Sequence, residues 1–373
     1  MASEWKTYKI KDVLSYVVDN RGKTPPIQDE GFELLEVNAI SATEKFPQYQ
    51  VVRKHVSGEV YNSCFRSGHP QIGDVLVPTV GTLGAVSYMN KNNCCIAQNL
   101  IALRANRDIC DCDYLYYILR NPNTRKRLLN LNIGGVQPSI KVPHLMDLEI
   151  KLPDIETQQK ISSILRAIDD KTDNNQRIND NLQQQAQAIY TSMFIDNADP
   201  AWEQGQLSDL ITVKYGKDHK KLADGKYPVF GSGGIMRYVE RPLYTGESVL
   251  IPRKGTLNNV MYVNEPFWSV DTMFFTEMKI PNVAKFVFHF VKAKDLASMN
   301  AGSAVPSMTT DILNAMELSI PSAERLAAFE SVVAPMYQAM QANNRESSKL
   351  AELRDNLLPK LMSGEVDVTT IDF

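Results

Sequence analysis

The sequence lacks any long hydrophobic run. No stretch reaches the roughly 18 to 20 apolar residues that a membrane-spanning helix needs, and the N-terminal segment MASEWKTYKIKD has no hydrophobic core of a signal peptide. We therefore expect a cytoplasmic protein without membrane contact. Its 373 residues, 43% of them hydrophobic, are enough for two or three globular domains.

Cysteine is scarce and unevenly placed. All five cysteines lie between Cys64 and Cys112, and an odd number in one stretch does not fit the paired framework of a secreted domain. The spacings at 94–95 and 110–112 differ from that of a zinc knuckle, and no histidine cluster lies nearby. We therefore expect reduced thiols and no bound metal.

The motifs of several enzyme classes are also missing. The sequence has no phosphate-binding Gly-x4-Gly-Lys-Ser/Thr, no dinucleotide-binding Gly-x-Gly-x-x-Gly, no serine nucleophile elbow and no His-Glu-x-x-His. Segment 147–151 (DLEIK) is similar to part of a nuclease site, but the related segment 317–319 (ELS) has lost the lysine. We therefore expect no catalytic residues and no cofactor bound by this chain.

What the sequence does contain is an internal repeat. Segment 75–83 (VLVPTVGTL) recurs as 249–257 (VLIPRKGTL), and Gly134-x3-Pro138-Ser139 recurs as Gly302-x3-Pro306-Ser307. A period of roughly 170 to 200 residues is too long for a solenoid and indicates a duplicated domain. Each copy has short β-rich segments followed by one long helix, which predicts two tandem α+β domains.

Apolar runs locate the expected elements within each copy. We predict short helices at 113–120 and 283–292 and strands at 75–77, 96–103, 148–152, 249–251, 273–275 and 316–320.

Two long helices follow Pro153 and Pro321. In both, an apolar stripe repeats with the heptad spacing of a coiled coil and turns polar in the middle, at Asn175 and Asn179 and again at Asn343. At 1.5 Å per residue each helix is about 50 Å long. We predict that they pack antiparallel, with a globular domain at each end and with pseudo-twofold symmetry. The predicted helix-helix interface consists of Ile161, Leu165, Ile168, Leu182, Ile189, Phe329, Val333, Met336, Leu350 and Leu357.

The net charge of −3 conceals an uneven distribution. Residues 1–152 carry 18 Lys+Arg against 15 Asp+Glu, a net of +3, and residues 214–294 carry 13 against 7, a net of +6. The two long-helix regions carry −3 each. Basic runs beside glycine-rich loops in both copies indicate a polyanion that is contacted twice.

These features together resemble the specificity subunit of type I restriction-modification enzymes, over nearly the whole chain. The resemblance is carried by the duplicated α+β units, by their long helices, and by the segments 21–25, 73–84, 153–161, 228–235, 251–255 and 267–272. The second helix junction, 321–329, lacks the glutamines of the first, so the two partner contacts of the family need not be equivalent here.

The resemblance implies a DNA-reading protein with five segments. Two target recognition domains would each read one part of a bipartite, asymmetric double-stranded DNA site. The long helices would set the spacer and dock two methyltransferase (modification) subunits, which bring S-adenosylmethionine and methylate adenine. Motor/nuclease (restriction) subunits would add cleavage that depends on ATP and Mg. The segments are the domains 1–152 and 197–320, the spacer helices 153–196 and 321–363, and a C-terminal tail 364–373.

Lysine and arginine would hold phosphates, and polar loop residues would read base edges. The predicted DNA contacts are Arg21, Lys23, Thr24, Gln137, Ser139 and Lys141 in the first domain and Lys217, Lys220, Lys221, Ser232, Arg253 and Lys254 in the second.

Two alternatives remain open at this stage. One is a DNA-reading subunit of a solitary modification system or of a nuclease-methyltransferase fusion system, which the neighbouring genes would distinguish. The other is a scaffold with a coiled-coil stalk that binds no DNA.

Overall fold

The computed structural model describes residues 5–299 and 307–368. The chain divides into two compact units, the first formed by Met1–Asn175 with Asn344–Phe373 and the second by Gln176–Asn343. Gly302 and Pro306 of the repeated motif, and the end of the predicted C-terminal tail, lie outside the described residues. Within the described ranges, none of the helices has both the length and the apolar character that a bilayer crossing demands.

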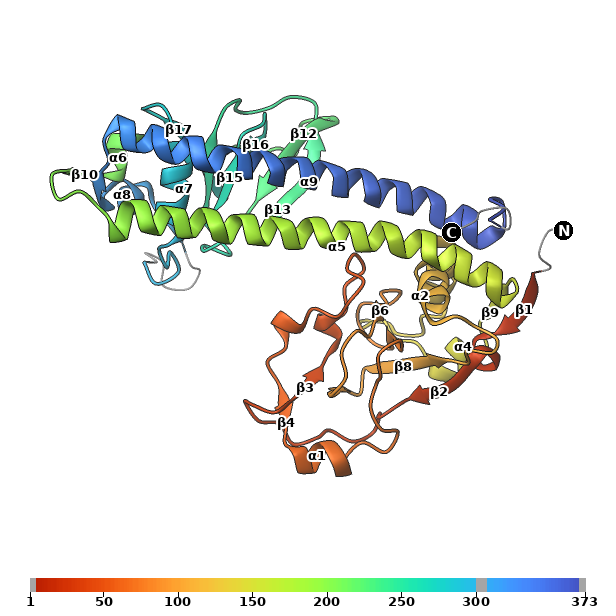
Figure 1. The fold of residues 1–373 in the computed structure, drawn as a ribbon. Helices are drawn as coiled ribbons and strands as arrows, with labels where there is room; N and C mark the ends of the chain where they lie inside the picture. The colour runs from red at the N-terminus through yellow and green to blue at the C-terminus, as the bar shows by residue number, and fades with distance from the viewer. Residues whose placement is uncertain (1–4, 300–306, 369–373) are drawn as a thin grey trace. The chain divides into compact units, whose positions relative to one another are not determined.

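The first unit contains three small sheets (Figure 1). The sheets are the antiparallel pair β1-β9, the antiparallel four-stranded β2-β8-β5-β6, and the three-stranded β4-β3-β7, in which β3 and β7 run parallel. The elements in chain order are β1 (Lys6–Lys9), η1 (Ile10–Val13), β2 (Leu14–Val18), β3 (Phe32–Leu35), η2 (Val37–Ala39), η3 (Tyr49–Val51), β4 (His55–Val56), α1 (Gly58–Ser63), β5 (Val75–Pro78), β6 (Ser87–Tyr88), β7 (Cys94–Ile96), β8 (Leu100–Ala105), α2 (Cys112–Arg120), α3 (Pro122–Leu129), α4 (Val142–Met146), β9 (Glu149–Leu152) and the start of α5 (Ile155–Thr191).

The second unit repeats this topology strand for strand. Its sheets are β10-β18, β11-β17-β14-β15 and β13-β12-β16, again with one parallel pair, β12 with β16. The elements in chain order after α5 are η4 (Ser192–Asp196), β10 (Glu203–Gln206), α6 (Leu207–Leu210), β11 (Ile211–Tyr215), β12 (Asp224–Gly231), β13 (Gly234–Val239), β14 (Ser248–Pro252), β15 (Met261–Val263), β16 (Trp268–Ser269), β17 (Met273–Met278), α7 (Ala284–Lys292), α8 (Thr310–Asn314), β18 (Glu317–Ile320) and α9 (Ala323–Ser363).

The predicted duplication of an α+β unit is thus confirmed. The single strand predicted at 96–103 is wrong, because β7 ends at Ile96 and a turn closed by the Leu100 N–H and the Ala97 carbonyl (3.0 Å) precedes β8. The apolar run therefore supplies strands to two different sheets. The polar pair Gln98-Asn99 inside the run marks this turn.

Short helix α2 fills the core of the first unit. Asp111 caps its first turn by accepting a hydrogen bond from the Tyr114 N–H, and Tyr114, Tyr116 and Tyr117 are fully buried. The same core takes in side chains from both long helices. Those that it buries include Ile161, Leu165, Leu358 and Leu361.

Helix α7 has the corresponding position in the second unit. Phe286 and Phe288 lie in a core with Tyr190 from α5 and with Phe329 and Val333 from α9. The predicted interface residues that are only half-buried are Leu182, Ile189, Met336, Leu350 and Leu357, whereas Ile168 is buried.

The two long helices run antiparallel within the first unit. Asp169 of α5 pairs with Arg354 of α9, and Asn175, later in α5, donates to the Ser347 hydroxyl (3.2 Å), earlier in α9. The Asn175 amide also donates to Glu346 (2.8 Å).

The same direction holds in the second unit. The Asn343 amide donates to the Asn179 side-chain oxygen (2.9 Å), and Arg325, earlier in α9, donates to the Met193 carbonyl (3.2 Å) in η4, which directly follows α5. The predicted antiparallel direction is therefore confirmed within each unit. The polar residues of the two stripes therefore contact one another by hydrogen bonds in a partly buried setting.

One buried hydrogen bond in each unit joins the short core helix to a long helix, with different chemistry in the two copies. In the first unit the Tyr117 hydroxyl donates to Asp169 (2.8 Å). In the second, His289 bonds the Tyr337 hydroxyl through Nε2 (2.9 Å) and Gln187 through Nδ1 (2.8 Å).

Candidate nucleic-acid interface

In each unit, strand ends bring several predicted DNA contacts to one sheet edge. In the second unit, the last residues of β11 and β14 face consecutive residues at the start of β17: Tyr215 is opposite Phe274, and Pro252 is opposite Met273. The loops that follow β11 and β14 therefore begin side by side.

The loop after β14 carries Arg253 and Lys254. The Arg253 guanidinium lies 5.3 Å from the centre of the exposed Tyr215 ring, a cation-π arrangement, and it also approaches the Asp271 carbonyl (3.4 Å). Gly255 has a φ of +85°, and a Cβ placed there would lie 2.9 Å from the Ser232 hydroxyl. The structure therefore brings Ser232, Arg253 and Lys254 together.

Lys217 is held at the same edge by its backbone. Its N–H donates to the Ser269 carbonyl (2.8 Å), and its own carbonyl accepts from the Trp268 indole (2.8 Å), which leaves the ammonium exposed. Lys220 and Lys221 are exposed on the turn that follows, and the Lys220 N–H donates to Asp218 (3.0 Å). No hydrogen bond or ion pair of the described residues joins this pair of lysines to Arg253.

The first unit has an equivalent loop after β5. Gly81 has a φ of +86°, close to that of Gly255, and its N–H donates to the Pro138 carbonyl (2.9 Å). Val80 forms an isolated bridge with Ser139, as Lys254 does with Ser307. Two segments that are about 55 residues apart in the sequence are thus neighbours, as in the second copy.

The segment 132–139 forms a closed loop on this edge. The Asn132 side-chain oxygen accepts from the N–H groups of Gly134 and Ser139 (both 2.9 Å), and Ile133 bonds Ser139 across the base. Gln137 stands exposed near the tip, and Lys141 is exposed before α4. Gln137, Ser139 and Lys141 therefore lie on one short stretch of surface.

Arg21 is less available than the sequence suggested. Its guanidinium holds both carboxylate oxygens of Asp19 (2.8 and 2.6 Å), which raises the pKa of Arg21 and lowers that of Asp19 through the paired hydrogen bonds. Lys23 and Thr24 beside it are exposed. Among the described contacts, no hydrogen bond or ion pair joins Arg21, Lys23 or Thr24 to the loop of Gln137.

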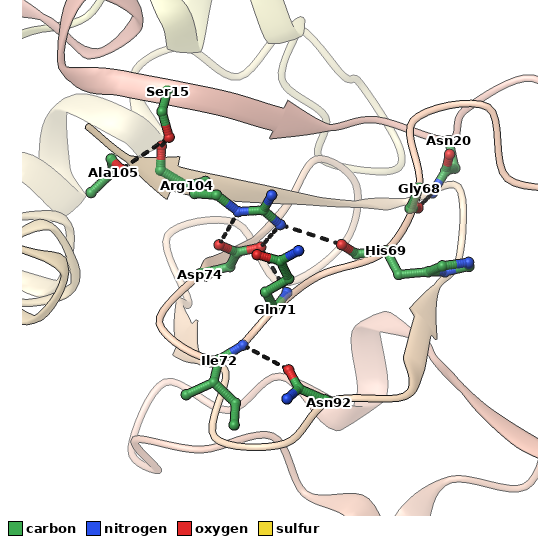
Figure 2. A network of polar contacts seen from close by, with 10 residues as sticks. All are labelled: Ser15, Asn20, Gly68, His69, Gln71, Ile72, Asp74, Asn92, Arg104 and Ala105. Carbon is green, nitrogen blue, oxygen red and sulfur yellow. Dashed lines mark hydrogen bonds and ion pairs between the residues drawn. The ribbon is translucent and has the colours of Figure 1, made fainter. Parts of the chain in front are cut away.

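A polar network fixes the position of the loop after β2 (Figure 2). Asp74, 1% exposed, receives two hydrogen bonds from Arg104 (2.9 and 2.8 Å), and this pairing raises the pKa of the guanidinium. The Asn20 amide donates to the Gly68 carbonyl (2.9 Å) in the adjoining turn. Arg104 also donates to the His69 carbonyl (3.4 Å), so it connects its strand to the turn that Asn20 contacts, and it has a structural partner in Asp74.

The sequence-based set omitted helix α3, which presents Arg125, Lys126 and Arg127 to solvent. Arg125 covers Gly84 of the loop after β5, since a Cβ at Gly84 would lie 2.9 Å from the Arg125 Cγ. A cavity of about 500 Å³ opens beside it, with basic side chains in its wall. The cavity is lined by Ala42, Thr43, Gly84, Val86, Arg120, Pro122, Arg125, Lys126, Leu129, Arg354, Asp355 and Leu358. In the sequence, the run of three consecutive basic residues at 125–127 indicates this basic face of α3.

The cysteines and Asp147, which resemble parts of metal or nuclease sites in sequence, have structural surroundings. Cys94, Cys95 and Cys110 are buried free thiols. Asp147 forms ion pairs with Lys9 (3.3 Å) and Lys11 (2.8 Å). Within residues 5–299 and 307–368, no three histidine, cysteine or acidic side chains come together as a possible metal site.

Two α+β units with matching loop edges and paired long helices define a duplicated recognition fold. The model of the "Type I restriction modification DNA specificity domain" family matches residues 2–184 and 200–326. The chain belongs to this family.

Individual relatives agree in sequence and in fold. The chain is 22% identical over 419 residues to the type I restriction enzyme MjaIX specificity subunit of Methanocaldococcus jannaschii, covering 98% of this chain and 94% of the relative. It is 21% identical to the HindI specificity subunit of Haemophilus influenzae over 384 residues, covering 74% and 82%. The fold is similar to the crystal structure of a type I restriction-modification system S subunit from M. genitalium, with a TM-score of 0.60, 19% identity and 96% of each chain covered.

Proposed function

We propose that this chain is the sequence-specific DNA-recognition subunit of a type I restriction-modification complex. The observation that carries the proposal is the repeated sheet edge, where each unit presents a glycine-centred loop beside exposed polar or basic side chains. As a specificity subunit it is a recognition component, and methylation and cleavage belong to other subunits. The two recognition domains correspond to the proposed segments 1–152 and 197–320, and each reads one part of a bipartite, asymmetric site.

Phosphate contacts supply most of the affinity in this proposal, and base contacts supply the sequence preference. In the second unit, Lys217, Arg253 and Lys254 lie at the edge where they can hold phosphates, with Ser232 placed for a base edge or sugar. In the first unit, Gln137 and Ser139 are suited to reading bases, because amides and hydroxyls pair with groove donors and acceptors. Lys23 and Lys141 supply charge beside them.

Helix α3 is a further phosphate-binding element in this proposal. The loop after β14 carries Arg253-Lys254, whereas the equivalent positions in the first unit are Thr79-Val80. Arg125, which lies over Gly84 of that loop, restores a cation at the place where the first copy lacks one.

The partners proposed are two methyltransferase subunits, docked on the long helices, and restriction subunits. S-adenosylmethionine would be bound by the former, and ATP and Mg by the latter. The modest net charge of the chain fits a division of labour in which these partners add phosphate contacts of their own.

Sequencing of methylated adenines in a host that carries the chain with its modification subunits tests the proposal. We expect one bipartite, asymmetric motif to be methylated, and methylation to vanish when this chain is deleted. Methylation that persists without the chain, or that follows a short continuous palindrome, would contradict the proposal.

A further inference from the structure

Large apolar side chains are exposed on the β12-β13 hairpin of the second unit. Ile235, Met236 and Tyr238 of β13 are 50%, 61% and 48% exposed, and Tyr215 at the end of β11 is 52% exposed. Exposed apolar clusters rimmed by polar groups mark interaction sites on soluble proteins.

Contacts connect this cluster to the basic loop after β14. The Met236 sulfur lies over Gly231, since a Cβ placed on Gly231 would be 2.6 Å from it. The next residue, Ser232, contacts Gly255. At the other side, Tyr215 lies under the Arg253 guanidinium at 5.3 Å. The exposed apolar residues and the cations are therefore parts of one surface.

The hairpin geometry turns Met236 outward. Val229 faces Arg237 and Phe230 faces Ile235, so Met236 is an extra residue that has no partner on β12. Such a β-bulge re-aims a side chain and increases the local twist. The two-residue turn Ser232-Gly233 closes the hairpin between Gly231 and Gly234, so its end is narrow.

The basic residues around this surface indicate which kind of partner it binds. Arg253 lies on Tyr215, and Lys217 and Lys254 are exposed close to these two residues along the chain. Such a cluster of cations favours a polyanion as the binding partner. A two-stranded β-ribbon fits the major groove of B-DNA. The apolar group that a base pair presents in that groove is the C5-methyl of thymine.

We infer, on the basis of the proposed function, that Ile235 and Met236 are specificity-determining residues of the second unit. They read an A·T pair in the major groove through contact with the thymine C5-methyl group. The neighbouring cations hold the flanking phosphates, which fixes the hairpin in register with the bases.

The test uses the chain assembled with its modification subunits and a duplex that contains the methylated motif. Each thymine of both half-sites is replaced in turn by deoxyuridine, which removes only the methyl group. In the wild-type complex we expect one or two replacements in a single half-site to weaken binding about fourfold, the effect of one buried methyl-sized group. In Ile235→Ala/Met236→Ala the same replacements should have no effect.

Two further variants sharpen the test. Ile195→Ala removes an isoleucine of the same unit that is 60% exposed on η4, and it should keep the full penalty for deoxyuridine. Gly231→Ala displaces only the flexible end of Met236, and it should reduce the penalty without removing a side chain.

Each contrary outcome has its own meaning. A wild-type complex that prefers no duplex overturns the proposed function itself. If Ile235→Ala/Met236→Ala binds the motif and keeps every deoxyuridine penalty, this inference is wrong although the proposed function stands. If the double variant fails to assemble with the modification subunits, the hairpin docks protein, and the inference is wrong as well.

Discussion

Asp169 on α5 and Arg354 on α9 form an ion pair with a nitrogen-oxygen distance of 3.2 Å and side chains only 6% and 13% exposed. The other oxygen of the same carboxylate accepts the hydroxyl of Tyr117 on α2 (2.8 Å). One carboxylate thus joins three helices of the first unit.

Removing the arginine should therefore destabilise this unit strongly. Arg354→Met leaves the Asp169 charge buried without its cation, which costs about 3 kcal/mol in comparable sites. Arg354→Met/Asp169→Asn should recover most of the loss, because the amide oxygen still accepts from Tyr117 and carries no charge. Hydrogen-deuterium exchange of α2 measures both effects within the first unit.

Lys171→Met is the matched control for this prediction, because Lys171 of α5 and Glu346 of α9 belong to the same unit as Asp169 and Arg354. Lys171 and Glu346 form an ion pair at 3.1 Å with both side chains more than 40% exposed, so its loss should change stability by less than about 1 kcal/mol. Equal losses in Arg354→Met and in the double variant would contradict the buried-charge explanation.

The second unit should lose stability in mild acid because of His289. The imidazole is fully buried, and burial, assisted by the charge of Lys292, lowers its pKa from 6.5 to about 3. The unfolded chain binds a proton near pH 6.5 whereas the folded unit does not, so the free energy of unfolding falls as the pH drops below 6.5. Between pH 7 and pH 5 we expect a loss of about 2 kcal/mol.

The control for this prediction is His289→Gln, followed by hydrogen exchange of α7 at the same pH values. The variant is expected to be less stable at pH 7 but to lack the additional fall between pH 7 and pH 5. An identical pH profile in both proteins would show that another group titrates.

Salt dependence should reveal the phosphate contacts of the second unit. Arg253→Ala/Lys254→Ala should weaken DNA binding by the assembled complex and reduce the slope of log K against log salt by about 1.8, or 0.9 per lost phosphate contact. Lys226→Ala/Arg241→Ala removes the same charge at the opposite end of the β12-β13 hairpin. It should leave the slope nearly unchanged, and equal slopes in the two double variants would argue against a local contact.

In the first unit, the exposed cations of α3 should matter more than Arg21. Arg125→Ala/Lys126→Ala removes two side chains that have no ion pair among the described residues, whereas Arg21 is already neutralised by Asp19. We expect about a tenfold or greater loss of affinity for the double variant and less than threefold for Arg21→Ala, measured by fluorescence anisotropy at one salt concentration. The reverse order would locate the interface at the loop of Arg21 instead.

The cysteines should differ in reactivity within the native chain. Burial raises the pKa of both Cys94 and Cys95 to about 12, so their thiols carry almost no thiolate at pH 8. Alkylation followed by peptide mass spectrometry should modify Cys64 before either of them. Rapid labelling of Cys95 without denaturant would contradict the buried sheet that holds it.

The features that repeat in the sequence were the ones that could be predicted from it. The matched segments 75–83 and 249–257 located the equivalent strands β5 and β14. The heptad spacing indicated that the two long helices pack on each other, and the order of the chain, with one long helix after each copy, indicated that they run antiparallel. A positive φ in each loop requires glycine at 81 and at 255. The same conformational requirement therefore leaves the same residue in both copies, and the repeat can be recognised from the sequence.

Tertiary pairing could not be predicted in the same way. Nothing local shows that the Arg104 guanidinium pairs with Asp74, 30 residues earlier in the chain, or that Arg125 covers Gly84 from a helix about 40 residues further along. The bulge at Met236 is equally hidden, because the register of β12 and β13 depends on both strands and on the turn between them.

The hydrogen bonds Tyr117–Asp169 and His289–Tyr337 also bear on how such a gene can recombine. A crossover at the junction of a globular part with its long helix would separate these partners. It would place Tyr117 against the helix that carries Tyr337, or the neutral His289 against the helices that carry Asp169 and Arg354. A crossover near the middle of both helices, where the compact units meet in sequence at residues 175–176 and 343–344, transfers each hydrogen-bonded pair intact. The smallest part of this protein that keeps its own buried hydrogen bonds is therefore a globular part together with the half-helices against which it folds.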